Sequence, residues 1–292
     1  MDIVLAIVAA FLFGVGTVLQ QRAAMKIPDE EAMKAGLLVR LAKQPVWVAG
    51  IVIDALGFVA QAVALAIGRI VVVQPLLATA VVFALPFGAR LDKRRLTRGE
   101  IVGAAAVVGG VAAFVVVANP TGGVDNPKLR VWLWTFAVCL GVSALLILLS
   151  RGRRAGIKAS LLGSAAGILF ALSAVLTKAV ADQLDEGIVE IFTHPHIYTL
   201  VAVGWVSMTV SSAALQTGAL APAAATQMSL DPVASVALGV FAFDESLHDT
   251  FVGGAVALVG FAVMIAGLVV LSRSQSSTER NKVVPTKAPM PA

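Results

Sequence analysis

Residues 46–67 read VWVAGIVIDALGFVAQAVALAI, and Asp54 is the only charged residue among them. A helix needs about 20 apolar residues to cross the hydrocarbon core of a bilayer, so this stretch has the length and composition of a membrane span. The same criterion selects eight more stretches and predicts an all-α, polytopic membrane helical bundle of nine transmembrane helices. The expected spans are 3–21, 46–67, 70–89, 101–118, 130–149, 159–180, 197–217, 222–242 and 250–272.

The composition of the whole chain excludes the soluble classes of protein. Of the 292 residues, 59% are apolar and 13% are charged, and the mean hydropathy is +0.92. A soluble domain carries about 25% charged residues, so this chain could not cover a water-facing surface with polar groups. We therefore exclude a cytosolic enzyme, a nucleic-acid-binding module and a disordered protein.

Basic residues lie mainly on one side of the expected spans. Of the 22 lysines and arginines, 18 fall in loops 22–44, 90–100 and 150–158 and in the tail after residue 272, and 4 fall on the other side. Because basic residues favour the cytoplasmic side, we expect a multi-pass plasma-membrane protein with its N-terminus outside and its C-terminus in the cytoplasm. The net charge of +5 then reflects topology and not nucleic-acid binding.

Internal similarity predicts an inverted repeat. Five spans separate the similar helices, so the two halves would have opposite orientations in the membrane, as in many alternating-access transporters. The similar pairs are 9–19 with 166–176, 74–85 with 227–238, and 103–109 with 254–260. The expected parts are a first repeat, a linking helix with a basic loop, a second repeat and a disordered cytoplasmic tail: 1–118, 119–158, 159–272 and 273–292.

Two carboxylates, Asp54 and Asp231, lie clearly inside the expected spans. A charged side chain is costly inside a membrane, so such residues usually face a partner or a cavity. Asp54 shares a helix face with Gln61, seven residues later, and Asp231 shares one with Gln227, four residues earlier. We expect these side chains to contact substrate or to couple protons, with a structural role for Asp54 as an equal alternative.

The stretch TQMSLDP, residues 226–232, is the most polar run within the expected spans. Pro232 cannot donate a backbone hydrogen bond, so it would weaken the helix and expose carbonyl groups. Polar side chains beside such a break are typical of substrate or ion sites. In the structural alternative, Asp231 caps a helix that starts at Pro232.

Amides at two other places have both functional and structural interpretations. Gln74 and Gln227 are equivalent in the repeat, so a pseudo-twofold axis could bring them together to bind an uncharged or zwitterionic ligand. Hydrogen bonding between helices is an equal alternative. Gln20, Gln21 and Lys178 lie at equivalent ends of the first and sixth spans, where we expect them to extend to the membrane interface.

The side opposite the basic loops is acidic and holds all three histidines. We expect a diffuse rim that concentrates cations and no specific metal site, since hard Mg²⁺ prefers oxygen ligands to imidazole. The residues are Asp2, Asp125, Asp182, Asp185, Glu186, Glu190, Asp244, Glu245, Asp249, His194, His196 and His248.

Four short motifs lie in or beside the expected spans: Phe13-Gly-Val-Gly16 followed by Gln20-Gln-Arg22, Trp47-Val-Ala-Gly50, His194-Pro195 and Ala219-Leu-Ala-Pro222. With the nine spans and the repeat, they resemble the drug/metabolite transporter (DMT, EamA-like) superfamily. The resemblance is closer to its NIPA-like branch, usually described as magnesium transporters, and covers nearly all of residues 1–272. Eukaryotic members of that branch place a glutamate where this chain has Phe58; the acidic residue here, Asp54, lies one turn earlier.

The leading hypothesis is a DMT-type secondary transporter that moves a small solute by alternating access. The alternative is a NIPA-like transporter of Mg²⁺ or another divalent cation, and the second alternative is a non-transporting or lipid-export component of a membrane complex. Expected partners are a small-molecule or ion substrate and membrane lipid, with a homodimer left open. The sequence has no GxSxG, P-loop or HExxH motif, so we expect neither an enzyme nor a cofactor.

Overall fold

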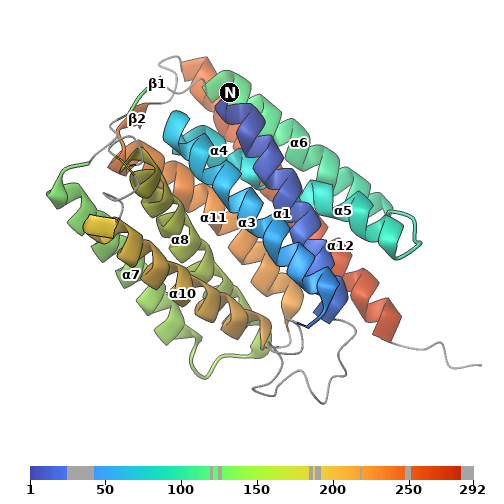
Figure 1. Cartoon of the computed structure of the whole chain (residues 1–292). Coiled ribbons are helices and arrows are strands. Elements are labelled where there is room, and N and C mark those ends of the chain that lie inside the picture. The colour runs from blue at the N-terminus through green and yellow to red at the C-terminus, as the bar shows by residue number, and fades with distance from the viewer. Residues whose placement is uncertain are drawn as a thin grey trace, which may run out of the picture.

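The structure is a computed structural model that describes residues 1–24, 43–118, 121–123, 127–183, 187, 192–217, 219–246 and 251–283. Strands β1 (Thr121–Gly122) and β2 (Glu245–Ser246) form a small antiparallel pair, and all other elements are helices (Figure 1). The helices are α1 (Asp2–Ala24), α3 (Pro45–Ile67), α4 (Ile70–Leu77), α5 (Ala80–Leu91), α6 (Arg98–Ala118), α7 (Leu129–Ser150), α8 (Ala155–Asp182), α10 (Pro195–Leu215), α11 (Leu220–Ala242) and α12 (Phe251–Val283).

The predicted all-α membrane bundle is confirmed. In the described part of the chain, eight helices are long and apolar enough to cross a bilayer, with α4 and α5 together as one. The eighth expected span, α11, has 23 residues but is not among these eight, because polar residues occupy its middle. The ninth, α12, continues as a helix to Val283, beyond its expected end at 272 and into the segment expected to be disordered.

The third expected span is interrupted in its middle. α4 ends at Leu77 and α5 begins at Ala80, and each half contains a proline, Pro75 and Pro86. At the break, the hydroxyl of Thr79 donates to the carbonyl oxygen of Leu76 over 2.6 Å. Proline lacks a backbone donor, and a threonine hydroxyl competes for helix carbonyls. Both residue types therefore weaken this helix where it breaks.

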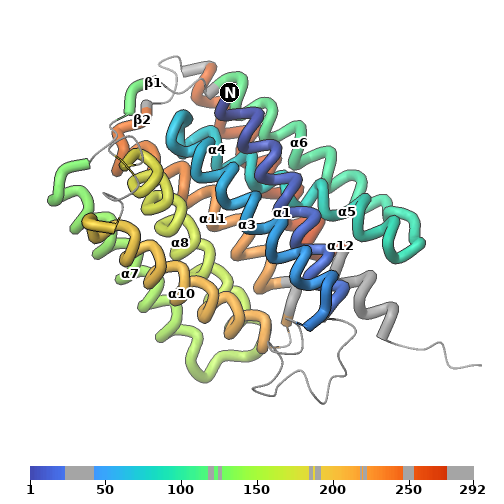
Figure 2. The backbone as a smooth tube through the Cα atoms, in the orientation of Figure 1, coloured from blue at the N-terminus to red at the C-terminus, as the bar shows by residue number. Residues whose placement is uncertain are grey.

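The helices pack as two groups and a separate pair. In the first group, α1 packs against α3, α4 and α5; in the second, α8 packs against α7, α10 and α11. The pair is α6 and α12, which lie against each other (Figures 1 and 2). The interior is centred on α8, whose Leu169, Leu172 and Leu176 are fully buried. The outward faces instead expose large apolar side chains such as Trp205 and Phe241, as lipid contact allows.

Glycines allow the helices to approach each other closely. At the crossing of α6 and α12, a Cβ atom on Gly110 would lie 2.5 Å from the carbonyl oxygen of Gly260 and 2.8 Å from the Cα of Met264. Membrane helices gain no hydrophobic energy by leaving lipid, so they associate through close packing on small residues. The abundance of Gly and Ala in the sequence therefore has a direct structural use.

The N-terminus of α6 is fixed by a buried glutamate. Glu100 accepts a hydrogen bond from the backbone N–H of Thr97 over 2.8 Å, and the Thr97 hydroxyl accepts one from the Glu100 N–H over 3.2 Å. This is a capping box, in which each residue satisfies a free donor of the other. Arg94 adds two hydrogen bonds of 2.9 Å to the same carboxylate.

Candidate substrate-binding site

Asp231 lies in the middle of α11, which continues without interruption through Pro232. The structural alternative, in which a new helix starts at Pro232 and Asp231 caps it, is therefore wrong. The hydroxyl of Ser235 donates to Oδ1 of Asp231 over 3.3 Å. Because Pro232 has no N–H, the carbonyl group of Met228, one turn earlier, lacks its usual partner within the helix.

Helix α8 approaches the Asp231 turn through Gly167. A Cβ atom at Gly167 would lie 2.8 Å from the carbonyl oxygen of Gln227 and 3.0 Å from the backbone nitrogen of Asp231. One turn earlier, Gly163 lies against Ala223 and Thr226 in the same way. The polar turn of α11 thus faces the backbone of α8 and is held inside the bundle.

Gln227 is one turn from Asp231 and bonds to a third helix. Its Oε1 accepts a hydrogen bond from the hydroxyl of Ser211 on α10 over 2.8 Å. This hydrogen bond joins α10 to α11 next to the Asp231 turn. The structure does bring Gln227 and Asp231 to one region of α11, as their spacing predicts.

Gln74 does not meet Gln227. Val71, three residues before Gln74, packs against Gly239 at the C-terminal end of α11, and α4 runs antiparallel to α11. Gln227 is twelve residues before Gly239, about 18 Å along the helix axis at 1.5 Å per residue. Gln74 is about 4.5 Å from Val71 on the same scale, so the two amides lie at different depths.

The same contact aligns the break in the third span with Asp231. Counting seven residues along each antiparallel helix from the Val71–Gly239 contact places Ala78 level with Pro232. The break between α4 and α5 and the proline-weakened turn of α11 therefore share one depth in the bundle. An interrupted helix that lines a polar region is typical of substrate sites in transporters built from repeats.

Two buried polar atoms on these helices have no hydrogen-bond partner in the described part of the chain. They are Nε2 of Gln74, whose side chain is 5% exposed, and the hydroxyl of Ser229, 7% exposed. Buried polar groups are normally paired with protein or water. Their presence on α4 and α11 therefore marks this region as polar and able to hydrogen-bond a substrate or water.

Asp54 lies between α3 and α1, away from the Asp231 turn. Its Oδ2 accepts a hydrogen bond from Nε2 of Gln20 and its Oδ1 lies against Gly16, so Gln20 faces α3 and not the membrane interface. Gln61, two turns further along α3, is partly buried and has no hydrogen-bond partner among the described residues. No hydrogen bond or ion pair between described residues joins Asp54 to Asp231.

We expect the Gln20–Asp54 pair to stabilise the α1–α3 contact. Replacing Gln20 by Leu leaves a buried acceptor unpaired, which costs about 1–3 kcal/mol. The double variant Gln20→Leu/Asp54→Leu removes both polar groups and should recover most of that loss. Thermal unfolding in detergent measures both effects. Equal losses in the single and double variants would contradict this role.

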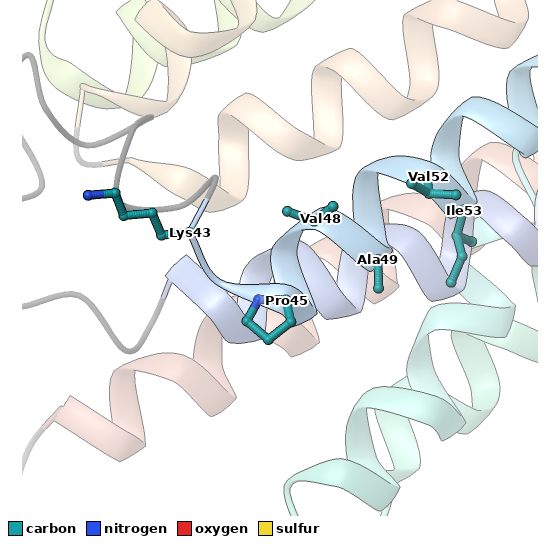
Figure 3. A pocket seen from close by; sticks show the side chains of 6 residues that line it. All are labelled: Lys43, Pro45, Val48, Ala49, Val52 and Ile53. Carbon is teal, nitrogen blue, oxygen red and sulfur yellow. The ribbon is translucent and has the colours of Figure 1, made fainter.

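Two cavities among the described residues contain none of the five predicted site residues. One, an open groove of about 510 Å³, follows the N-terminal part of α3 (Figure 3). Its lining is apolar apart from the Lys43 side chain, which extends away from the helix. The other, about 190 Å³, is polar and is lined by both Lys178 and Glu245.

Lys178 and Glu245 are buried, with 6% and 1% of their surfaces exposed. The predictions that Lys178 extends to the interface and that Glu245 belongs to an acidic surface rim are therefore wrong. Burial raises the pKa of the Glu245 carboxyl above its ordinary value, and the backbone N–H groups of Val71 and Ile70 act against that rise. Both residues bind backbone groups that are more than 100 residues away in the sequence, so the residues beside them in the sequence do not indicate these contacts.

The acidic and histidine-containing side is only partly described. His196 is described; its Nδ1 lies 2.7 Å from Nε2 of Gln183, and its ring packs against Trp132. Among the residues that the structure describes, no three His, Cys, Asp or Glu side chains form a group that could hold a metal ion. Asp125, Asp185, Glu186, Glu190, His248 and Asp249 lie outside the described residues.

The chain matches a family model and another protein over nearly its whole length. A family model described as "Magnesium transporter NIPA" matches residues 1–277. An uncharacterized protein of Corynebacterium glutamicum is 27% identical over 281 residues, which cover 96% of this chain and 97% of that protein. No solved structure matches the chain.

Proposed function

Because this chain belongs to the magnesium transporter NIPA family, we propose that it carries divalent cations, Mg²⁺ first, across the plasma membrane. The sequence alone ranks a small solute ahead of a divalent cation, and the family match reverses that order. The observation that carries the proposal is Asp231, a carboxylate on a proline-weakened turn level with the break between α4 and α5.

The chemistry around Asp231 suits a partly hydrated cation. Mg²⁺ prefers oxygen ligands, keeps several of its waters and is usually bound through one or two carboxylates. Asp231 supplies one carboxylate, and the carbonyl group of Met228 is not used by the helix. We assign cation contact to these two residues and place Gln227 beside them. We assign Asp54, Gln61 and Gln74 to other positions along the transport path.

We further propose alternating access between two inverted halves, with the N-terminus outside and the C-terminus in the cytoplasm. The packing supports this proposal, since α1 contacts α3 and α5 much as α8 contacts α10 and α11. In the proposed repeat, α1 corresponds to α8 and α3 corresponds to α10. The two helix pairs make contact at corresponding places: Gly16 lies against Asp54 between α1 and α3, and Ser173 lies 3.5 Å from Ser207 between α8 and α10. Rocking of such halves about a central site is the usual transport movement.

Uptake into liposomes tests the proposed substrate. We expect purified protein to admit Mg²⁺, reported by a trapped fluorescent indicator, at a rate at least tenfold above that of protein-free liposomes. Mn²⁺ and Co²⁺ serve as divalent competitors and Na⁺ as the monovalent control. If Mg²⁺ enters at the protein-free rate while a reconstituted magnesium channel is active in parallel, the divalent-cation proposal is wrong.

A small uncharged solute is the second candidate, favoured by the amide and hydroxyl of Gln227 and Ser211 beside Asp231. A ligand that binds the folded state raises its apparent stability. A thermal-shift panel of divalent cations, amino acids, nucleosides and sugars therefore separates the two candidates. Stabilisation by a neutral solute and not by Mg²⁺ would support the second.

A further inference from the structure

Glu245 joins strand β2 to the N-terminus of α4. Its Oε1 accepts a hydrogen bond from the backbone N–H of Ile70 and its Oε2 accepts one from the N–H of Val71, both over 2.9 Å. These N–H groups belong to the first turn of α4, and the N–H groups of a first turn have no acceptor within their own helix. A negative charge there also interacts favourably with the helix dipole. The carboxylate thus holds α4 from the other half of the chain.

Lys178 makes the reciprocal connection from α8 to the end of α3. Its ammonium group donates to the carbonyl oxygens of Leu65 over 3.0 Å and Gly68 over 3.3 Å. It also pairs with Asp182 on its own helix at 3.5 Å and lies 5.9 Å from the centre of the Phe243 ring. A helix C-terminus presents unpaired carbonyl groups and attracts positive charge. Lys178 therefore binds the C-terminal end of α3, where the backbone carbonyl groups have no partner within the helix.

We call these two side chains and their four backbone partners the polar latch. The latch joins residues of the first half, in the α3–α4 connection, to residues of the second half, in α8 and β2. It lies at the end of the bundle that carries the N-terminus, β1 and β2 (Figure 1).

Residues around the latch are enclosed by protein. All residues of α4 except Leu77 are buried, and Phe243, whose ring lies near Lys178, is fully buried. The Glu245 carboxylate and the Lys178 ammonium group therefore meet their backbone partners where little water reaches them.

We propose that Glu245 and Lys178 form the outer gate of the transport path, and that both sets of latch bonds must break before the outer end can open. This inference rests on the proposed alternating-access function and adds to it the device that closes one side. Hydrogen bonds to charged groups are strong when water is excluded, yet water replaces them readily. A polar latch can therefore hold the halves together and still release them.

Labelling of an introduced cysteine tests the gate without any transport measurement. Val73 is fully buried on α4, two residues further along the helix than Val71, whose N–H binds Glu245. In a Cys139→Ser background, we expect Val73→Cys to react slowly with a membrane-impermeant maleimide added outside. Adding Glu245→Ala or Lys178→Met should raise the reaction rate at least tenfold, because either change removes one set of bonds between the halves.

Two further variants separate gating from general loosening. Lys178→Arg keeps a donor to the Leu65 and Gly68 carbonyls and should restore slow labelling. Glu100→Ala removes an equally buried glutamate whose partners, Arg94 and Thr97, lie in the same half, so it should leave the rate unchanged. If Glu245→Ala does not elute as a folded protein, Lys178→Met decides the test.

The outcomes distinguish this inference from the proposed substrate. Labelling at the unmodified rate in the folded latch variants, or an equal rise in Glu100→Ala, would overturn the gate. A tenfold rise in the latch variants alone supports it, whether or not Mg²⁺ is transported. Failure of Mg²⁺ uptake together with that rise would overturn the substrate and leave the gate in place.

Discussion

Asp231→Asn is expected to reduce the rate of Mg²⁺ uptake into liposomes by ten- to a hundredfold. The change removes the carboxylate that we assign to the cation and keeps the size of the side chain. An interaction with a charged group is worth about 1.5–3 kcal/mol, and each 1.4 kcal/mol is a tenfold change in an equilibrium or rate constant. The fold should persist, since the amide oxygen can still accept the Ser235 hydroxyl.

An exposed carboxylate provides the matched control for this variant. Asp92 follows α5 at the surface, so Asp92→Asn removes the same charge far from the Asp231 turn and should transport at the unmodified rate. If Asp231→Asn also transports at that rate, with equal amounts of folded protein in the liposomes, Asp231 does not contact the cation.

Gly110→Leu is expected to abolish or severely reduce the yield of folded protein. Even a Cβ atom at Gly110 would lie within 3 Å of the backbone of α12, so a leucine must separate α6 from α12. Overpacking by smaller additions already costs about 1–3 kcal/mol. The yield of monodisperse protein after detergent extraction and its thermal unfolding temperature measure the effect.

The adjacent Gly109 is the control for that prediction. A Cβ atom at Gly109 would meet nothing within 4 Å, and the residue lies on an exposed face of α6. Gly109→Leu should therefore fold with an unchanged or slightly higher unfolding temperature, because leucine favours the helix by close to 1 kcal/mol over glycine. Equal losses for both variants would mean that the α6–α12 contact does not determine the stability of the bundle.

The membrane helices could be predicted from sequence because the thickness of the bilayer sets their length. The edges of the second span, expected at 46–67, agree with α3 at Pro45–Ile67, since apolar residues must fill the hydrocarbon region and polar residues cannot. The position of Asp231 on a polar stretch of α11 was also predictable, because few ionisable residues occur inside the spans. Its environment was not, because Gly167 of α8, which packs against it, is far away in the sequence.

The break in the third span and the latch were not predictable in the same way. The stretch from 70 to 89 contains no charged residue. The interruption at Ala78–Thr79 depends on backbone hydrogen bonding, because Pro75 cannot donate to a carbonyl group and the Thr79 hydroxyl donates to that of Leu76. Lys178 and Glu245 bind backbone atoms, which every residue possesses. No pattern of side chains could therefore have identified their partners, and both residues resembled ordinary charges at a membrane surface.

The separation of the Gln74 and Gln227 amides was also not predictable from the sequence. The proposed inverted repeat would put equivalent residues at opposite depths about the membrane midplane, so such residues share a depth only if both lie at the midplane. The Val71–Gly239 contact places Gln74 and Gln227 at different depths. The same contact places Ala78 and Pro232 level with each other.

The most direct test of the central claim, that Asp231 holds the transported cation, is the amount of Mg²⁺ bound by purified protein. Equilibrium dialysis at a series of Mg²⁺ concentrations gives the affinity for the wild type, Asp231→Asn and Asp92→Asn. We predict saturable binding by the wild type and Asp92→Asn, and an affinity at least tenfold weaker in Asp231→Asn. Equal affinity in all three proteins, or no saturable binding by the wild type, would contradict the account.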